Sequence, residues 1–257
     1  MASFIINTKA ELLKCRKTAA YWMTLGCGVF IPLIMFISYI SRPDIFVKEL
    51  ASDPWDIHFQ RSWQSAAAFL MPMYVVLVTS LVVQVEYRNN TWKQVYASPR
   101  SYADIYFSKF VIVHLMILAS FIAFDLCLIL GGYMANVIRS DYNFFSTPIP
   151  WDSFLSRTSR LYISILGVTS IQYWLSLRFR NYIAPVGIGL ALLITGLIIM
   201  SWEKVVYYPY AYTALTYFKN LNSKVAAGHK HEWYSLIWFA VVLIAGFWDT
   251  VKRRERG

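Results

Sequence analysis

Two ionisable side chains lie inside a long apolar stretch, where they could bind a charged group or carry a proton. Asp125 is the one acid deep in an apolar run, and His114 precedes it by about three helical turns, so both lie on one helix face. An ionised carboxylate at the centre of a bilayer costs about 2.5–3.5 kcal/mol, so Asp125 should face protein or water. Two interpretations stay open: a polar stripe along a pathway or against a partner helix, and a locally satisfied or protonated packing group.

Motifs of known catalytic centres are absent from the sequence. It contains no GxxxxGK motif for nucleotide phosphates and no GxSxG or HExxH signature. His229 and His231 could form at most a weak surface metal site, and the three cysteines lack the spacing of a metal or disulfide framework. We therefore expect a chain that is not itself an enzyme and binds no metal. Gln172 belongs to a small polar set that suits a pathway or helix packing, with Thr169, Ser170 and Ser176.

A polar segment at residues 86–104 separates two apolar runs and predicts a short helix. Thr91 and Gln94 fit a capping box, and Pro99 should end the helix. An aromatic and apolar face is expected because three residues lie at i, i+3 and i+4: Trp92, Val95 and Tyr96. Polar side chains surround this face: Glu86, Arg88, Lys93 and Arg100. A short amphipathic helix of this kind favours contact with a partner protein.

The composition indicates an all-α membrane protein with a single domain over residues 1–257. Hydrophobic residues make up 58% and the mean hydropathy is +0.46, above the usual apolar content of soluble domains. Six transmembrane helices are expected at 19–40, 63–85, 105–136, 160–177, 182–201 and 233–248. The net charge of +10 comes from basic residues dispersed between apolar runs, so no nucleic-acid partner is expected.

Two further elements are expected beside the spans. Residues 1–18 predict an amphipathic helix in the membrane interface, with its lysines toward the lipid headgroups. One side carries Phe4, Ile5, Thr8, Leu12 and Cys15, and the other carries Asn7, Glu11, Lys14 and Lys17. Residues 202–232 predict an extracellular hairpin, re-entrant or interfacial, that includes Tyr208, Pro209 and Tyr210. An ordinary aromatic belt at the end of a span is the alternative.

The basic residues also predict the orientation in the membrane. Most of the 24 Lys and Arg residues fall at the two termini, in residues 86–109 and in the short turn at 178–181. Because cytoplasmic segments are enriched in Lys and Arg, both termini are expected in the cytoplasm of a multi-pass protein of the cell membrane.

The ordered set of these features resembles the ABC type-2 transporter permeases, and is similar to their small subgroup linked to lantibiotic and antimicrobial-peptide immunity. Local similarities are Glu86 with Thr91-Trp92-Lys93, then Pro99 and Lys109, and the later Tyr208-Pro209-Tyr210. The resemblance covers almost the whole chain. It implies a permease subunit of an ATP-driven exporter for an amphipathic or hydrophobic substrate, such as an antimicrobial peptide or a lipid, in a bacterial inner membrane.

Under this resemblance, residues 91–98 form the coupling helix that docks on a separate ATPase. Trp92 and Tyr96 would be its apolar anchors, and residues 1–18 would be the family's connecting helix near the ATPase. The resemblance implies two ATPase copies, with ATP and Mg²⁺ bound there, and a second permease chain in a homo- or heterodimer. The polar contacts to the ATPase would be Glu86, Arg88, Lys93 and Arg100.

Two functions of other classes stay open. One is a proton-coupled secondary transporter in which His114 and Asp125 act as a relay. The other is a membrane scaffold or sensor subunit without transport of its own, whose basic C-terminal tail anchors it to lipid or a partner.

Overall fold

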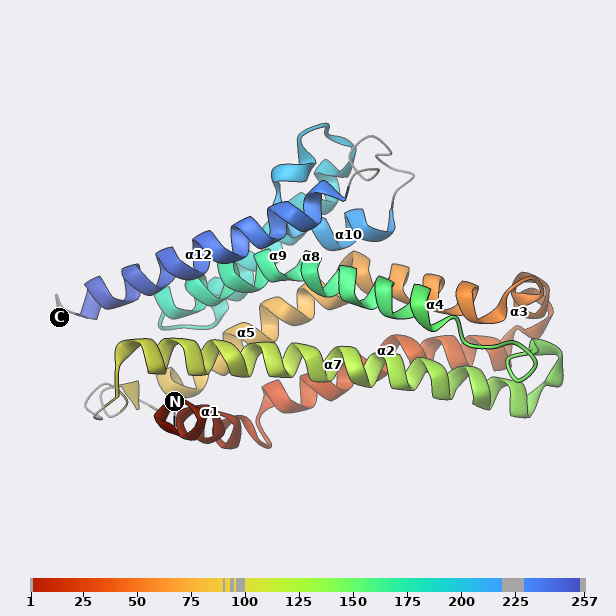
Figure 1. The fold of residues 1–257 in the computed structure, drawn as a ribbon, viewed down its shortest axis with the longest axis horizontal. Coiled ribbons are helices and arrows are strands. Elements are labelled where there is room, and N and C mark those ends of the chain that lie inside the picture. Colours follow the sequence, from red (N-terminus) through yellow and green to blue (C-terminus); the bar gives the residue numbers. More distant parts are fainter. Residues whose placement is uncertain (1, 90, 93–94, 96–99, 219–228, 255–257) are drawn as a thin grey trace.

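The computed structural model describes residues 2–89, 91–92, 95, 100–218 and 229–254, and helices make up most of this part of the chain (Figure 1). The long helices are α2 (Ala19–Ser41), α5 (Met71–Arg88), α7 (Tyr102–Ile138), α8 (Trp151–Arg178), α9 (Ile183–Ile198) and α12 (Lys230–Arg254). The shorter helices are α1 (Ala2–Cys15), α3 (Pro43–Leu50), α4 (Pro54–Ser65) and α10 (Tyr212–Tyr217). A π-helical turn η1 (Ala66–Leu70) joins α4 to α5, and four short 3₁₀ turns are η2 (Ser140–Tyr142), η3 (Ile199–Ser201), η4 (Val205–Tyr207) and η5 (Pro209–Ala211). The described residues contain no strand, and the expected all-α class is confirmed.

Five helices of the described chain are long and apolar enough to cross a membrane. They are Ala19–Ser41, Pro54–Arg88, Tyr102–Ile138, Ile183–Ser201 and Lys230–Arg253. The second one runs from α4 through η1 into α5, and therefore begins before the expected start at residue 63. These helices are those of a multi-pass membrane protein.

The helix α8, which contains the expected span 160–177, is not one of these five, although it is 28 residues long. Its polar side chains between Leu161 and Leu177 face inward and are buried, whereas its first ten residues expose Asp152, Ser156 and Ser159. The buried polar residues are Ser164, Thr169, Ser170, Gln172 and Ser176.

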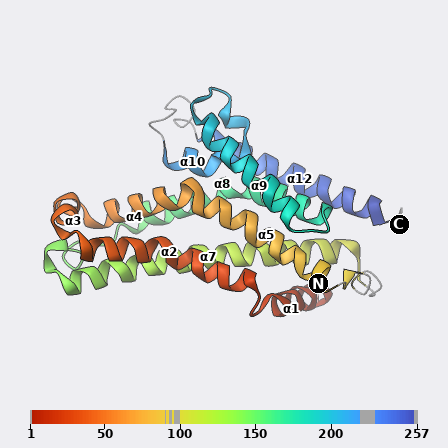
Figure 2. The same ribbon diagram turned by 180° about the vertical axis from the view of Figure 1, so that it is seen from behind.

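The helices form two groups joined through a central helix. In one group α2 packs along α7, and in the other α8 packs along α12. The continuous helix of α4, η1 and α5 runs between them, and α5 contacts α2, α7, α8 and α9. Figures 1 and 2 show α7 along the long axis of the molecule, with α5 and α12 inclined to it. The central position of α5 means that any movement of this helix affects both groups.

Both termini lie at one end of the bundle, where α1 crosses its long axis (Figure 1). At the opposite end, aromatic side chains bind helices to one another and to the loop that follows η2. The Tyr39 hydroxyl lies 2.6 Å from His58 Nδ1, and Trp55 Nε1 donates to the Phe144 carbonyl oxygen at 3.0 Å. Since α7 has 37 residues and is about 55 Å long, it exceeds the roughly 30 Å of a hydrocarbon core.

The segment before α12 folds as the short elements η4, η5 and α10. They pack against α8, α9 and η1 in the side of the bundle, partway along its length (Figure 1). Tyr210 and Tyr212 are buried there, whereas Tyr207 is exposed. This segment, Val205–Tyr217, is therefore part of the core and not a free loop.

A close approach of α2 and α7 depends on Gly28. A Cβ atom there would lie 2.7 Å from the Ala123 Cβ and 3.0 Å from the Ser120 carbonyl oxygen, both on α7. Gly26, two residues earlier on the same helix, has no heavy atom within 4 Å of such a Cβ. Of these two glycines, only Gly28 is required by the packing of α2 against α7.

We predict that Gly28→Ala lowers the free energy of unfolding by about 1–3 kcal/mol, because overpacking forces the two helices apart. Gly26→Ala is the matched control and should leave stability unchanged or slightly raised, since alanine is the better helix former. Thermal unfolding of the purified variants in one detergent checks this. Equal midpoints for the two variants would contradict the α2–α7 packing.

Candidate functional site

The polar segment 86–104 is fastened to the end of α5 through Glu86. The Thr91 backbone N–H donates to the Glu86 carbonyl oxygen at 3.1 Å, and the Thr91 hydroxyl donates to the Glu86 carboxylate. The Val95 N–H then donates to the Thr91 carbonyl oxygen at 2.9 Å, which is the bond of a helical turn. Gln94 and Pro99, which carry the predicted cap and stop, lie outside the described residues.

Four charged side chains from three helices meet at this end of α5. On one side of the cluster, Lys14 Nζ of α1 lies 2.6 Å from Glu11 Oε1 and 2.7 Å from Glu86 Oε1. On the other side, Lys109 Nζ of α7 lies 2.5 Å from Glu11 Oε2 and 3.4 Å from Glu86 Oε1. Each glutamate therefore contacts both lysines. This Glu11–Lys14–Glu86–Lys109 cluster, here called the ion network, joins α1, α5 and α7.

The ion network is largely removed from water and balanced in charge. Glu86, Glu11 and Lys109 are buried, while Lys14 reaches partly to the surface. Burial lowers the pKa of Lys14, but its hydrogen bonds to Glu11 and Glu86 outweigh burial and raise that pKa above the ordinary lysine value. A buried charge without its partner is costly, so each member of the network requires the others.

The helix α1 turns two residues of its predicted polar side, Asn7 and Glu11, toward the protein. Asn7, Glu11 and Cys15 follow one another at intervals of four residues and are buried, whereas Lys14 and Lys17 of the predicted polar side are exposed. The apolar residues face outward instead: Ile5, Ile6, Leu12 and Leu13. The physical reason is the buried Lys109, whose ammonium group requires the Glu11 carboxylate.

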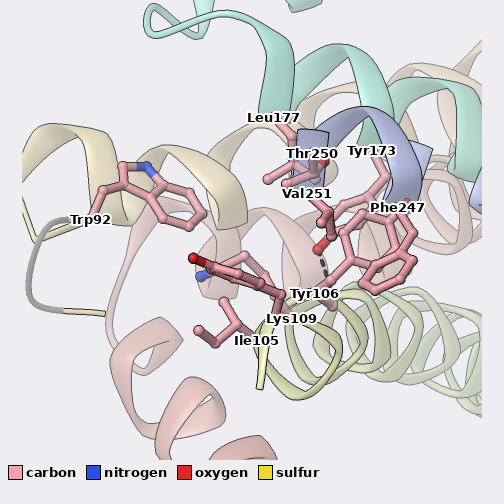
Figure 3. A pocket seen from close by; sticks show the side chains of 10 residues that line it. Trp92, Ile105, Tyr106, Lys109, Tyr173, Leu177, Phe247, Thr250 and Val251 are labelled. Carbon is pink, nitrogen blue, oxygen red and sulfur yellow. Dashed lines mark hydrogen bonds between the residues drawn. The ribbon is translucent and has the colours of Figure 1, made fainter. Parts of the chain in front are cut away.

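The Trp92 ring faces the core of its own chain. It is buried, with Lys109 Nζ 5.8 Å from the ring centroid and the Tyr87 ring centroid at 5.3 Å. Trp92 also lines a small apolar pocket between the start of α7 and the ends of α8 and α12, shown in Figure 3 with Tyr106, Leu177 and Phe247. The surface anchor expected at Trp92 is thus turned inward, because the lysine beneath it attracts the face of the ring.

The other predicted contact residues differ in their exposure. Arg88 is exposed at the end of α5, and Arg100 is partly exposed just before α7. Val95 is partly buried and packs against the hydrophobic core. Lys93 and Tyr96 lie outside the described residues. The exposed described residues of the segment are Arg88, Asn89, Ser101 and Tyr102, and Trp92 is not among them.

His114 and Asp125 face α8, but each has its own partner there. His114 Nδ1 lies 2.8 Å from the Tyr162 hydroxyl, and the Thr158 hydroxyl donates to the Asp125 carboxylate at 3.1 Å. Tyr162 and Thr158 are one helical turn apart on α8. These separate contacts with α8 support helix packing as the role of His114 and Asp125.

Of the predicted hairpin residues, Tyr210 contacts Gln172 and Tyr208 contacts α9. Tyr208 donates its hydroxyl to the Leu192 carbonyl oxygen at 2.8 Å, and Pro209 begins η5. The Tyr210 hydroxyl donates to Gln172 Oε1 at 3.2 Å. Sequence reasoning placed these residues on separate elements and did not predict the contact.

The two histidines considered for a weak metal site have protein partners. The His229 ring contacts the Arg160 guanidinium group, and His231 Nε2 lies 3.2 Å from the Thr216 hydroxyl. Among the described residues, no group of three or more His, Cys, Asp or Glu side chains is placed to hold a metal ion.

The ion network was not predicted from the sequence, although the sequence contains a signal for it. Glu11 is the one acid among the first 18 residues, and Lys109 lies inside the expected apolar span 105–136. A lone acid in a basic helix and a lone lysine in an apolar helix predict a pair, because neither is stable alone when buried.

The comparison with protein families identifies the chain. A model of the ABC-2 family transporter proteins matches residues 8–196, well over half of its length. The chain belongs to the ABC-2 transporter family. Comparisons with curated proteins and with solved structures gave no match. This ABC-2 permease is therefore the membrane subunit of a transporter, a kind of subunit that is generally not catalytic itself, and membership implies association with an ABC ATPase.

We predict that Lys109→Met lowers the free energy of unfolding by about 3–5 kcal/mol, because it leaves two buried glutamates with one half-exposed lysine. Lys252→Met, at an exposed lysine near the end of α12, is the control and should change stability little. Thermal unfolding of both variants gives the comparison.

A thiol on α1 reports whether this helix stays docked in the variant. Cys15 is buried next to Glu11, and burial raises the pKa of its thiol to about 11, so it should react slowly with maleimide at neutral pH. Lys109→Met should speed this reaction at temperatures well below unfolding. Unchanged stability and unchanged Cys15 labelling together would refute the ion network.

Proposed function

We propose that this ABC-2 permease is the membrane-spanning subunit of an ATP-driven exporter, and that segment 86–104 passes movement of the ATPase to the membrane helices. The observation that carries this proposal is the ion network. Through Glu86, the segment is bound to α5, and the same carboxylate contacts the lysines of α1 and α7. A displacement of the segment therefore acts on three helices at once.

The proposed topology has six spans, with α8 as the sixth membrane helix. Its 28 residues are enough to cross a bilayer, and its buried polar side chains face α5, α9 and α12. The two termini at one end of the bundle agree with an even number of spans. We place that end in the cytoplasm, following the distribution of Lys and Arg in the sequence.

The working complex in this proposal contains two permease chains and two ATPases. ATP and Mg²⁺ bind to the ATPases, and the substrate route lies between the permeases, which are identical or related. ATP-driven closure of the ATPases draws the two segments together, and the attached helices change the side to which the route opens. An amphipathic or hydrophobic substrate, such as an antimicrobial peptide or a lipid, suits this apolar bundle in a bacterial inner membrane.

The exposed face of α1 supports a position in the membrane interface. Ile5, Ile6, Leu12 and Leu13 point away from the protein, with the exposed cations Lys9 and Arg16 among them. Apolar side chains mixed with cations fit the boundary between acyl chains and anionic headgroups. The helix would thus be held by lipid on one face and by the ion network on the other.

The structure gives less support to a proton relay. His114 and Asp125 bond to Tyr162 and Thr158 and lie about 16 Å apart along α7, so a proton would need intermediate carriers between them. Family membership favours the ATP-driven mechanism over this relay and over a scaffold without transport.

We predict that an ABC ATPase co-purifies with the tagged chain from its native membrane in mild detergent, and that Arg88→Glu reduces the recovered ATPase about fivefold. Arg88 is exposed beside the segment, and one exposed ion pair contributes up to about 1 kcal/mol. Lys48→Glu is the control, because Lys48 is exposed on α3 at the opposite end. Mass spectrometry of the eluted complexes provides the measurement.

Equal ATPase recovery with Arg88→Glu and Lys48→Glu would mean that docking does not use this side of the segment. Absence of any ATPase with the unaltered chain would refute the exporter proposal.

A further inference from the structure

Gln172 joins three helices and the segment Val205–Tyr217. It is fully buried on α8, and its Nε2 donates to Ser80 Oγ of α5 at 3.1 Å and to the Pro185 carbonyl oxygen of α9 at 2.8 Å. Its Oε1 accepts the Tyr210 hydroxyl of η5 at 3.2 Å. Both ends of the amide are therefore occupied by groups from other elements.

The surroundings of Gln172 are shaped to hold it. A Cβ atom at Gly189 would lie 2.6 Å from Gln172 Oε1 and 2.8 Å from a methyl carbon of Val76, so only glycine leaves space for the amide. Ser80 is oriented by a further contact of 3.1 Å with the Ser176 hydroxyl. In an apolar interior these hydrogen bonds have no water to replace them.

The same helix α5 carries both this junction and the ion network. Ser80 precedes Glu86 by six residues, or about 9 Å along a rigid helix. At Glu86 the helix holds segment 86–104, and at Ser80 it holds Gln172. A displacement of α5 reaches Gln172 without passing through any loop.

We propose that Gln172 is a positioning residue that transmits the displacement of α5 to Val205–Tyr217 through Tyr210. The proposal rests on the function proposed above, since the displacement originates in the ATPase. When α5 moves, the Ser80–Gln172–Tyr210 contacts make the segment follow, because breaking them would leave buried polar groups without partners.

A second tyrosine offers a matched control. The Tyr208 hydroxyl also binds the segment to the bundle, but through the Leu192 carbonyl oxygen of α9 at 2.8 Å, and within the described residues it makes no hydrogen bond to Gln172 or α5. Tyr208→Phe and Tyr210→Phe each remove one hydroxyl from neighbouring positions and keep the ring. Only the second should interrupt transmission.

The first measurement is hydrogen–deuterium exchange of residues 205–217 in the permease alone, in lipid nanodiscs. Both Tyr→Phe variants should accelerate exchange about threefold, which corresponds to the loss of an average hydrogen bond in a membrane interior. Gln172→Leu should accelerate it further because three contacts are lost. Unchanged exchange in Tyr210→Phe and Gln172→Leu would refute the positioning role, whatever the function of the chain.

The second measurement repeats the exchange on the complex with its ATPase, before and after addition of ATP and Mg²⁺. The unaltered chain and Tyr208→Phe should show an ATP-dependent change in residues 205–217. Tyr210→Phe and Ser80→Ala should lose this change while the rate of ATP hydrolysis and the unfolding temperature stay near those of the unaltered chain. A merely structural role would not separate these readouts.

The outcomes distinguish the two proposals. If Tyr210→Phe and Ser80→Ala keep the ATP-dependent change, transmission through Gln172 is refuted and the exporter proposal stands. If the unaltered complex hydrolyses ATP without any change in these residues, transmission is refuted as well. If no ATPase binds, the exporter proposal fails and transmission fails with it, while the first measurement still decides whether Gln172 positions the segment.

Discussion

The arrangement of this protein depends on two glutamates and two lysines that neutralise one another at one end of the helical bundle. Lys109 is buried inside a mostly apolar helix, and its charge requires carboxylates close by. Glu86 arrives from α5 and Glu11 from α1, so the need for charge balance fixes the position of both helices. The same balance draws in Lys14 and, through the Thr91 hydroxyl, the beginning of segment 86–104.

One consequence concerns the surface that a partner meets. Because Lys109 attracts the Trp92 ring, the largest aromatic side chain of the segment supports the chain itself. The exposed described residues of the segment are Arg88, Asn89, Ser101 and Tyr102. Contact with the ATPase would then rely on these residues and on the rigid placement of the segment more than on the burial of Trp92.

A second consequence follows from the polar interior. The hydroxyl and amide groups of α8 beyond Leu161 face inward and bind neighbouring helices, while apolar side chains of α2, α7, α9 and α12 face outward. In a bilayer this distribution is favourable, since outward polar groups would lack partners in lipid. Gln172 shows what the interior polarity achieves, because a single amide holds α5, α9 and a segment that is distant in sequence.

The sequence by itself determined the all-α class and most of the helices, since hydrophobic runs act over a few turns of chain. It also pointed to the ABC-2 family, which the family comparison shows. It could not determine the orientation of α1, because that depends on Lys109, which lies 98 residues from Glu11 along the chain. Likewise Trp92 turns inward and Tyr210 reaches Gln172 only because folding brings distant charges and hydroxyl groups together in an interior without water. Tertiary structure decided which polar groups are buried, and the cost of leaving them unpaired decided where their helices lie.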